Sequence, residues 1–371
     1  MEVCIRRPKG WPSVLFSVLA MLALAVSPAD FSDVAARAAA ARQANDASHA
    51  LDLYRQAVQL NPQWAEGWWF IGNLSADAGR FTDCRDALQH FVRLEDQQAQ
   101  GWSTLGLCEF ETGDYSASLD HIRHALASGA GIPADMVDVL RFHEALVLTR
   151  AGQFDLALRS YAAIVRGGPR SETFVAGLGL AALHKPLLPD DIPPDQQDLY
   201  RIAGTAMGKS MAGDEDGAQA GFRDLLSRYP ANPDVQYLYG TWLLPQHPDD
   251  GIKQLESLLD SDPQRDDVRA MIAYNLVQRG HLNRALPFAK KAAEDAPANP
   301  LAQYVYGRAL AGTGDLQTGI AHLETAAKLD PSSLDCHMAL ASAYSRAGRP
   351  VDSRRERMES IALARASGAG S

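Results

Sequence analysis

Residues 301–331, LAQYVYGRALAGTGDLQTGIAHLETAAKLDP, decide the fold. Apolar side chains recur at intervals of three and four residues on both sides of Gly314, which predicts two amphipathic helices joined by a turn. Pro331 ends the second helix, because proline cannot continue one. One such pair cannot bury its own apolar faces. The segment therefore predicts a unit that is stable only when it packs against others of its kind.

Copies of this unit recur at a fixed interval of 34 residues, which separates Gly280, Gly314 and Gly348 and also Gly79 and Gly113. Prolines 263, 297 and 331 have the same spacing. A small residue precedes each turn glycine by seven positions and allows the two helices to cross closely. These residues are Gly72, Gly106, Ala145, Ala206, Ala273, Gly307 and Ala341. Such periodicity predicts a helical solenoid rather than a set of globular domains.

The net charge of the chain argues against a nucleic-acid partner. The chain has 371 residues and a formal net charge of −10. A protein that follows a phosphate backbone needs a basic stripe, so we expect no nucleic-acid partner.

The four cysteines, at positions 4, 84, 108 and 336, show neither a C-x-x-C spacing nor a zinc pattern. Cys84 and Cys108 fall in adjacent predicted helices, and each occupies an apolar position. A disulfide between them is one interpretation. We favour small buried core residues, because a buried free cysteine behaves as a small hydrophobic side chain.

Residues 1–29 have the layout of an export signal. Arg6, Arg7 and Lys9 precede an uncharged run from Trp11 to Val26, and small residues follow. The run is shorter than the roughly 20 residues that a membrane-spanning helix needs, which favours cleavage. An uncleaved anchor formed by residues 11–26 is the alternative. We expect an exported protein, periplasmic or secreted, that meets a membrane only through this segment if it is not cleaved.

The repeats form two blocks, at 31–184 and 199–367, and the unit at 172–198 is degenerate. Residues 174–184 have the pattern of a first helix, but four prolines follow within 186–194 where its partner should be. We interpret residues 185–198 as an ordered crossover loop, with a flexible linker as the alternative. The last helix is strongly charged, as expected of a terminal cap, and residues 368–371 are expected to fray.

The repeated residues resemble the tetratricopeptide repeat family. Its pattern is matched by Trp102, Leu105-Gly106, Tyr115 and Ala125, and again by Tyr306-Gly307, Gly314, Leu323, Ala326 and Pro331. The resemblance covers 31–184 and 199–367. It implies an all-α, right-handed solenoid of about eight to nine helix–turn–helix units. Similar proteins bind peptides or partner proteins on a concave surface lined by first helices, and the fold by itself implies no chemistry.

At the groove-facing positions, this chain lacks the family's best-known ligand site, which is a carboxylate clamp of lysine and asparagine. Only Asn73 matches in kind, and no lysine accompanies it. These positions carry instead a row of aromatic residues with polar neighbours, a composition enriched at binding surfaces. The candidate binding residues are Trp69, Asn73, Phe142, Tyr237, Thr241, Tyr274, Tyr304 and Arg308. Packing is favoured for Trp69 and Phe142, whereas binding and packing both stay open for the tyrosines.

Motifs that suggest chemistry are weak. The segment GTAMGKS at 204–210 has three residues between its glycines where a phosphate loop has four, and it falls within a predicted helix. His121 and His124 share a helix face, but no further ligand follows at a fixed spacing. We therefore predict no catalytic residue, no metal and no cofactor.

The sequence thus predicts a non-catalytic scaffold of the cell envelope that binds an extended peptide or a partner protein. A glycan-handling accessory protein that uses the same aromatic residues is the main alternative. An enzyme with its site at the proline-rich break, around His184, Asp190 and Asp191, is a further alternative, because function often lies in irregular loops.

Overall fold

The computed structural model describes residues 28–128, 131–165 and 171–368, and these residues are helical apart from turns and loops. The chain divides into two compact units, Met1–Pro133 and Ala134–Ser371. The predicted export segment lies outside the described residues except for its last two positions, as does most of the expected frayed tail. In the described ranges, no helix has the length and apolar character needed to cross a bilayer.

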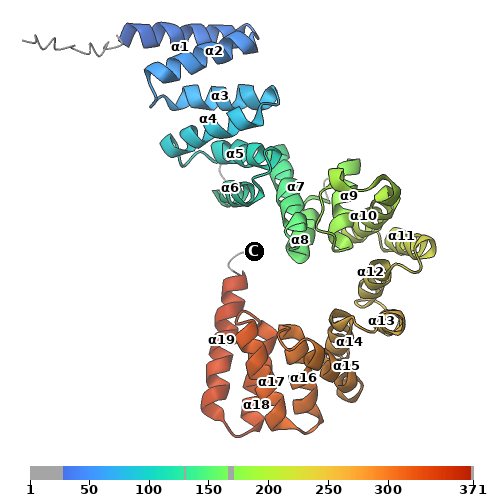
Figure 1. Ribbon diagram of the computed structural model, residues 1–371. Helices are drawn as coiled ribbons and strands as arrows, with labels where there is room; N and C mark the ends of the chain where they lie inside the picture. Colours follow the sequence, from blue (N-terminus) through green and yellow to red (C-terminus); the bar gives the residue numbers. More distant parts are fainter. Residues whose placement is uncertain (1–27, 129–130, 166–170, 369–371) are drawn as a thin grey trace, which may run out of the picture. The chain divides into compact units, whose positions relative to one another are not determined.

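The first unit consists of three helix pairs stacked in sequence order (Figure 1). They are α1 (Pro28–Gln43) with α2 (Ala47–Leu60), α3 (Ala65–Asp77) with α4 (Phe81–Leu94), and α5 (Ala99–Glu111) with α6 (Tyr115–Ser128). The turns between paired helices use the predicted glycines: Gly79 and Gly113 have φ angles of 68° and 79°, a region that disfavours side chains.

The second unit contains six further pairs and one odd helix. The pairs are α7 (Ala134–Arg150) with α8 (Phe154–Val165), α10 (Gln197–Met211) with α11 (Glu215–Arg228), α12 (Pro233–Leu243) with α13 (Pro248–Ser261), α14 (Asp266–Gln278) with α15 (Leu282–Asp295), α16 (Pro300–Thr313) with α17 (Leu316–Leu329), and α18 (Leu334–Arg346) with α19 (Pro350–Gly368). The odd helix is α9 (Glu172–Ala182). The described residues thus form nine pairs, which confirms the predicted all-α repeat fold and its one degenerate unit.

The proline-rich segment 185–198 belongs to the second unit. It contains two short 3₁₀ helices, η1 (Pro189–Asp191) and η2 (Pro194–Gln196), and Ile192 between them is buried in the core around α10. Lys185 pairs with Asp234 at 2.6 Å. The boundary between the compact units lies at 133/134, away from this segment, and the block limits inferred from the sequence stay a prediction.

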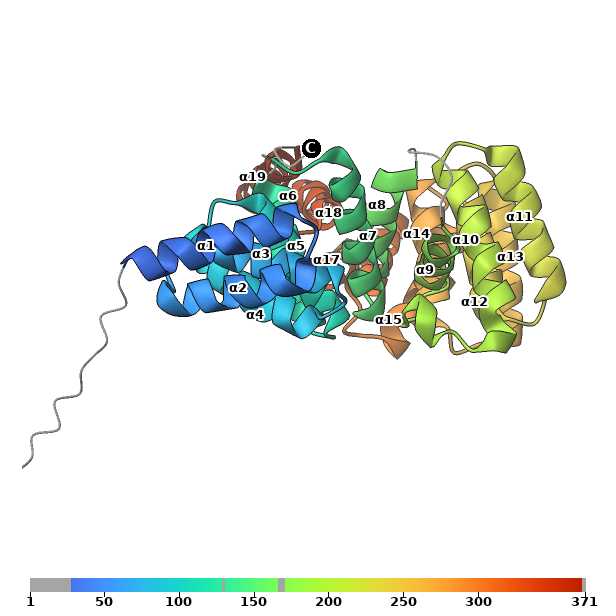
Figure 2. The same ribbon diagram turned by 90° about the horizontal axis from the view of Figure 1, so that it is seen from above.

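Helix α9 packs on α10 through two glycines (Figure 1 and Figure 2). A Cβ added at Gly179 would lie 1.9 Å from the carbonyl oxygen of Tyr200, and one at Gly204 would lie 1.9 Å from that of Val175. Gly204 is also the first residue of the GTAMGKS segment, which is helical throughout and opens no phosphate loop. The glycines at this crossing serve close packing.

The prediction for Cys84 and Cys108 was wrong: they form a disulfide between α4 and α5. Both side chains are buried, so the expectation of core positions is correct. The error arose because the apolar pattern places a residue on a buried face without showing which residue faces it. Cys336 is free and buried in the second unit, and burial raises the pKa of its thiol to about 11.

Candidate interaction surface

The candidate binding residues predicted from the sequence lie in both units. Trp69 and Asn73 lie on α3 of the first unit, and the other candidate residues lie in the second. Trp69 is half-buried against Phe91, with ring centroids 5.2 Å apart, and the two line a hollow of about 330 Å³. The Asn73 amide donates to the carbonyl of Trp69 at 2.8 Å. These two residues mainly stabilise their own helix pair.

Phe142 on α7 also packs inward. Its ring centroid lies 5.6 Å from that of Phe174 and 6.3 Å from that of Tyr161. Both neighbours are buried core residues of the second unit. The packing interpretation of Phe142 therefore accords with its contacts.

Tyr237 on α12 is held between two side chains of its own unit. Its ring lies 5.8 Å from the His184 ring and 5.1 Å from the Arg265 guanidinium. Arg265 is itself fixed, because two of its nitrogens each lie 2.8 Å from the carboxylate of Asp267. Burial raises the pKa of Tyr237 to about 12. The Thr241 hydroxyl donates to the Tyr237 carbonyl at 2.9 Å, so neither side chain is free of structural contacts.

The structure brings together the other three predicted residues, and adds one that the sequence did not single out. Tyr274 on α14 and Tyr304 on α16 have ring centroids 6.3 Å apart. The Tyr274 hydroxyl donates to Asp335 on α18 at 3.2 Å. Arg308 lies one turn after Tyr304, and its Nε is buried without a hydrogen-bond partner among the described residues. We call Tyr274, Tyr304, Arg308 and Asp335 the tyrosine–arginine surface.

Burial differs among these residues. Tyr304 is only 6% exposed and belongs to the core, and burial raises its pKa to about 12. Tyr274 and Arg308 are half-buried. Asp335 is half-buried too, so a partner can reach Tyr274, Arg308 and Asp335, but not the buried Nε of Arg308. The only sequence signal for Asp335 is its position as a polar residue in the first turn of α18, the first helix of the following pair.

The histidine pair on α6 is structural. His121 Nδ1 lies 2.7 Å from the buried Glu109 carboxylate, and hydrogen bonding to Glu109 raises its pKa. The Trp102 ring contacts both His121 and His124, at 4.9 and 4.8 Å. Across the described residues, no group of three potential ligands could hold a metal ion.

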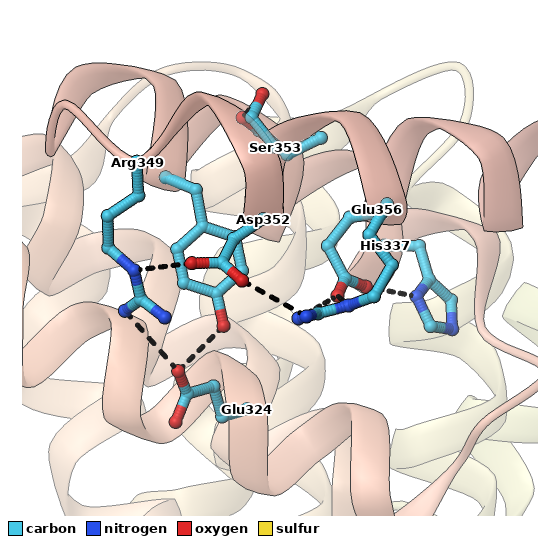
Figure 3. A network of polar contacts seen from close by, with 9 residues as sticks. Glu324, His337, Arg349, Asp352, Ser353 and Glu356 are labelled. Carbon is cyan, nitrogen blue, oxygen red and sulfur yellow. Dashed lines mark hydrogen bonds and ion pairs between the residues drawn. The ribbon is translucent and has the colours of Figure 1, made fainter.

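Charged side chains fasten the terminal helix α19 to α17 and α18 (Figure 3). We call this network the α19 clamp; its members are Glu324, His337, Arg349, Asp352, Arg355 and Glu356. Arg349 lies 2.8 Å from Asp352 and 3.8 Å from Glu324. Arg355 lies 3.0 Å from Asp352 and 2.9 Å from Glu356. His337 Nδ1 lies 2.8 Å from Glu356 Oε2, and both residues are buried.

The second nitrogen of His337 makes a contact that recurs in other repeats. A side chain on the first helix donates to the backbone carbonyl six residues earlier, in the preceding turn. The donors are Trp68, Trp102, Gln236, Arg269 and Gln303, and His337 Nε2 occupies the same place, 3.0 Å from the Pro331 carbonyl. Because a carbonyl and a carboxylate only accept, both ring nitrogens of His337 carry protons in this geometry. This geometry favours the imidazolium form of the side chain.

We expect the α19 clamp to weaken as the pH rises. Burial by itself lowers the pKa of His337, but hydrogen bonds to Glu356 and Pro331 oppose it and leave the pKa above the usual 6.5. A raised folded pKa contributes stability that is fully present below pH 6.5 and is lost as the pH passes the folded pKa. Hydrogen exchange of α19 should therefore be faster at pH 8.5 than at pH 6, after correction for intrinsic rates. The expected difference is about 1 kcal/mol, the size of a hydrogen bond.

The neighbouring unit supplies a control for this experiment. Gln303 and His322 have the same 19-residue spacing as His337 and Glu356, and His322 Nδ1 lies 2.7 Å from Gln303 Oε1. Burial lowers the pKa of His322. The double variant His337→Gln, Glu356→His transplants this pair and should remove the loss of protection at high pH. Unchanged pH dependence would assign the effect to another group.

A family model supports the repeat fold. The tetratricopeptide repeat model matches residues 142–206, 270–333 and 307–368. No curated protein matches. The chain is similar to a structure described as MamA 41-end from Desulfovibrio magneticus RS-1, at 19% identity over 45% of this chain and 96% of that one, with a TM-score of 0.41. It is also similar to one described as Crystal structure of MamA, at 16% identity over 44% of this chain and 96% of that one, with a TM-score of 0.39.

Proposed function

From this all-α tetratricopeptide-repeat fold, we propose that the chain is a non-catalytic scaffold that binds an extended segment of a partner protein. The tyrosine–arginine surface supports the proposal, because it joins the first helices α14, α16 and α18. Repeat proteins of this kind present binding residues on successive units, so that one peptide contacts several of them.

The observation that carries the proposal is the state of Arg308. Its buried Nε has no hydrogen-bond partner in the described part of the chain. Leaving a buried donor unsatisfied costs about 1–3 kcal/mol. A bound segment that moves the half-buried Arg308 side chain would bring this donor to one of its own carbonyls or carboxylates, while Tyr274 packs against the same segment. The cost of the unpaired donor would then contribute to affinity.

We place this scaffold outside the cytoplasm as part of the same proposal. The Cys84–Cys108 disulfide supports an oxidising compartment, since such bonds are rare in cytosolic proteins. The basic and apolar layout of residues 1–29 is consistent with export. Anchoring by residues 11–26 stays the alternative. Mass spectrometry of the mature N-terminus distinguishes the two.

Contacts at the aromatic row favour a protein partner over a glycan. Sugar stacking needs an open ring face, whereas Tyr304 is 6% exposed and Tyr237 lies between His184 and Arg265. At the proline-rich break, the His184 ring is stacked on Phe154 at 4.8 Å, and burial lowers its pKa. Asp191 lies 3.4 Å from Arg150. These groups are engaged in packing and ion pairing, which favours the scaffold over an enzyme at the break.

Arg308→Met tests the proposal. It keeps much of the side chain's bulk and removes the donor and the charge, and we expect it to lower partner affinity at least tenfold, equivalent to about 1.4 kcal/mol. Chemical crosslinking of envelope extract followed by quantitative mass spectrometry would identify the partner and measure its recovery. Lys290→Met, an exposed charge loss on the second helix α15, is the matched control. Equal losses for both variants would refute the role of Arg308.

A further inference from the structure

Each first helix in the regular part of the second unit packs on the pair that precedes it. At α16 this contact is made by Leu301, Ala302 and Tyr306. They cover Ala270 on α14 and Ala292 and Ala293 on α15, none of which is more than 6% exposed. These three alanines thus mark the place where the next first helix sits.

The pair α18 and α19 carries the same positions, and no described helix of the second unit covers them. Two repeats, or 68 residues, after Ala270, Ala292 and Ala293 stand Met338, Ser360 and Ile361. All three line a hollow of about 490 Å³ between α18 and α19. Met338 is 56% exposed and Ile361 is 44% exposed. The two helices lie at the end of the series that begins with α14 in Figure 1.

The rim of this hollow is cationic. Its remaining lining residues are Ala341, Ser342, Ser345, Arg346 and Arg357. Arg357 occupies the position held in the two preceding units by Ala289 and Leu323, both fully buried and apolar. No ion pair of Arg346 or Arg357 occurs within the described residues. A docked helix would bury these guanidinium groups. Their charges would be buried without partners unless the helix supplied carboxylates to pair with them.

We propose that this hollow, which we call the terminal seat, binds an amphipathic helix of a partner protein that carries acidic residues beside its apolar face. The apolar face takes the place on Met338 and Ile361 that Leu301, Ala302 and Tyr306 take two repeats earlier, on Ala270 and Ala293. The acidic residues pair with Arg346 and Arg357. The small side chains of Ala341, Ser342 and Ser360 allow the close approach that helix packing requires, with axes about 8–10 Å apart.

A plain solvated cap explains the terminal seat less well. A cap turns polar residues to water, and the charged side chains of α19 fit that description. The seat positions themselves do not, because Met338 and Ile361 are apolar and largely exposed. A second copy of this chain is the other possible occupant. The acidic helix is favoured because the two arginines of one seat would repel those of another in a symmetric contact.

Two synthetic peptides test the proposal with the full chain. Both carry Leu, Ala and Tyr at the spacing of residues 301, 302 and 306, on an alanine-rich helical background. One has glutamate at the flanking positions and the other has lysine. In fluorescence anisotropy at low salt, the glutamate peptide should bind at least tenfold more tightly than the lysine peptide. The double variant Arg346→Glu, Arg357→Glu should reverse this order.

Substitutions on α19 separate the seat from general surface effects. Ile361→Lys should lower the affinity for the glutamate peptide at least tenfold. Met358→Lys should leave binding unchanged, because Met358 is 66% exposed on the same helix and does not line the hollow. Equal affinity for both peptides, or no effect of Ile361→Lys, would overturn the proposal. Self-association of the chain in sedimentation that Ile361→Lys abolishes would assign the seat to a second copy and overturn it too. The tyrosine–arginine surface is unchanged in all these variants.

Discussion

Gly179→Ala is expected to reduce the free energy of unfolding of the second unit by about 3 kcal/mol or more. The added Cβ would lie 1.9 Å from the Tyr200 carbonyl oxygen and 2.7 Å from its carbon. Both atoms are backbone, so no side-chain rotation relieves the overlap. Helices α9 and α10 must separate, and the buried residues around them lose contact. Gly204→Ala meets the Val175 carbonyl in the same way and should have a similar effect.

Gly208→Ala is the matched control for this prediction, since it lies on the same helix α10. Its Cβ would meet only Leu178 Cδ2, at 3.6 Å, which is an ordinary contact. Alanine is favoured over glycine inside a helix, so this variant should gain about 0.5–1 kcal/mol. Urea unfolding followed by circular dichroism measures both. A Gly179→Ala variant within 1 kcal/mol of the parent would contradict the close crossing.

Removing the Cys84–Cys108 disulfide is expected to reduce the stability of the first unit by about 3 kcal/mol. The bond closes a loop with a sequence separation of 24 residues between α4 and α5. Its loss restores conformational freedom to the unfolded chain, which is the main source of disulfide stabilisation in the chain-entropy account. The variant Cys84→Ala, Cys108→Ala leaves both buried positions apolar. It therefore limits other effects to two small cavities.

Three measurements check the prediction for the disulfide. Peptide mapping without reductant should recover residues 84 and 108 as a linked pair. Thermal unfolding should show the first unit less stable in the double variant and in the reduced parent. Cys336→Ala should leave the first unit unchanged, since Cys336 is free and lies in the second unit. Finding both thiols free in protein isolated from its native compartment would contradict the bond.

The repeat fold could be predicted because its determinants are local. Turn glycines such as Gly79, prolines that end helices, and apolar positions three and four residues apart all act within one helix pair. The odd helix α9 could be predicted for the same reason, since the prolines of 186–194 exclude a partner helix. A resemblance to a repeat family adds the stacking of neighbouring pairs. It does not say which side chains face each other.

The contacts between units required the structure. The apolar positions of Cys84 and Cys108 show that both are buried, but not that they meet. The same limit applies to Tyr304, which the period places on the groove side and the structure buries against Tyr274. The doubly protonated form of His337 is favoured by its contact with Glu356, which lies 19 residues away on the next helix. Pairing across helices is set by packing angles that the apolar period does not determine.

Site-specific photo-crosslinking tests the proposed scaffold most directly. A photoreactive amino acid would replace Tyr274 or its exposed neighbour Gln278 on the first helix α14, which leaves Arg308 in place, and Lys253 or Glu294 on the second helices α13 and α15 as controls. The account predicts that irradiation of living cells links one partner protein to the first-helix positions, and that the linked peptide is a single extended segment. Crosslinks to that partner only from Lys253 and Glu294, or none from any of the four positions, would contradict it.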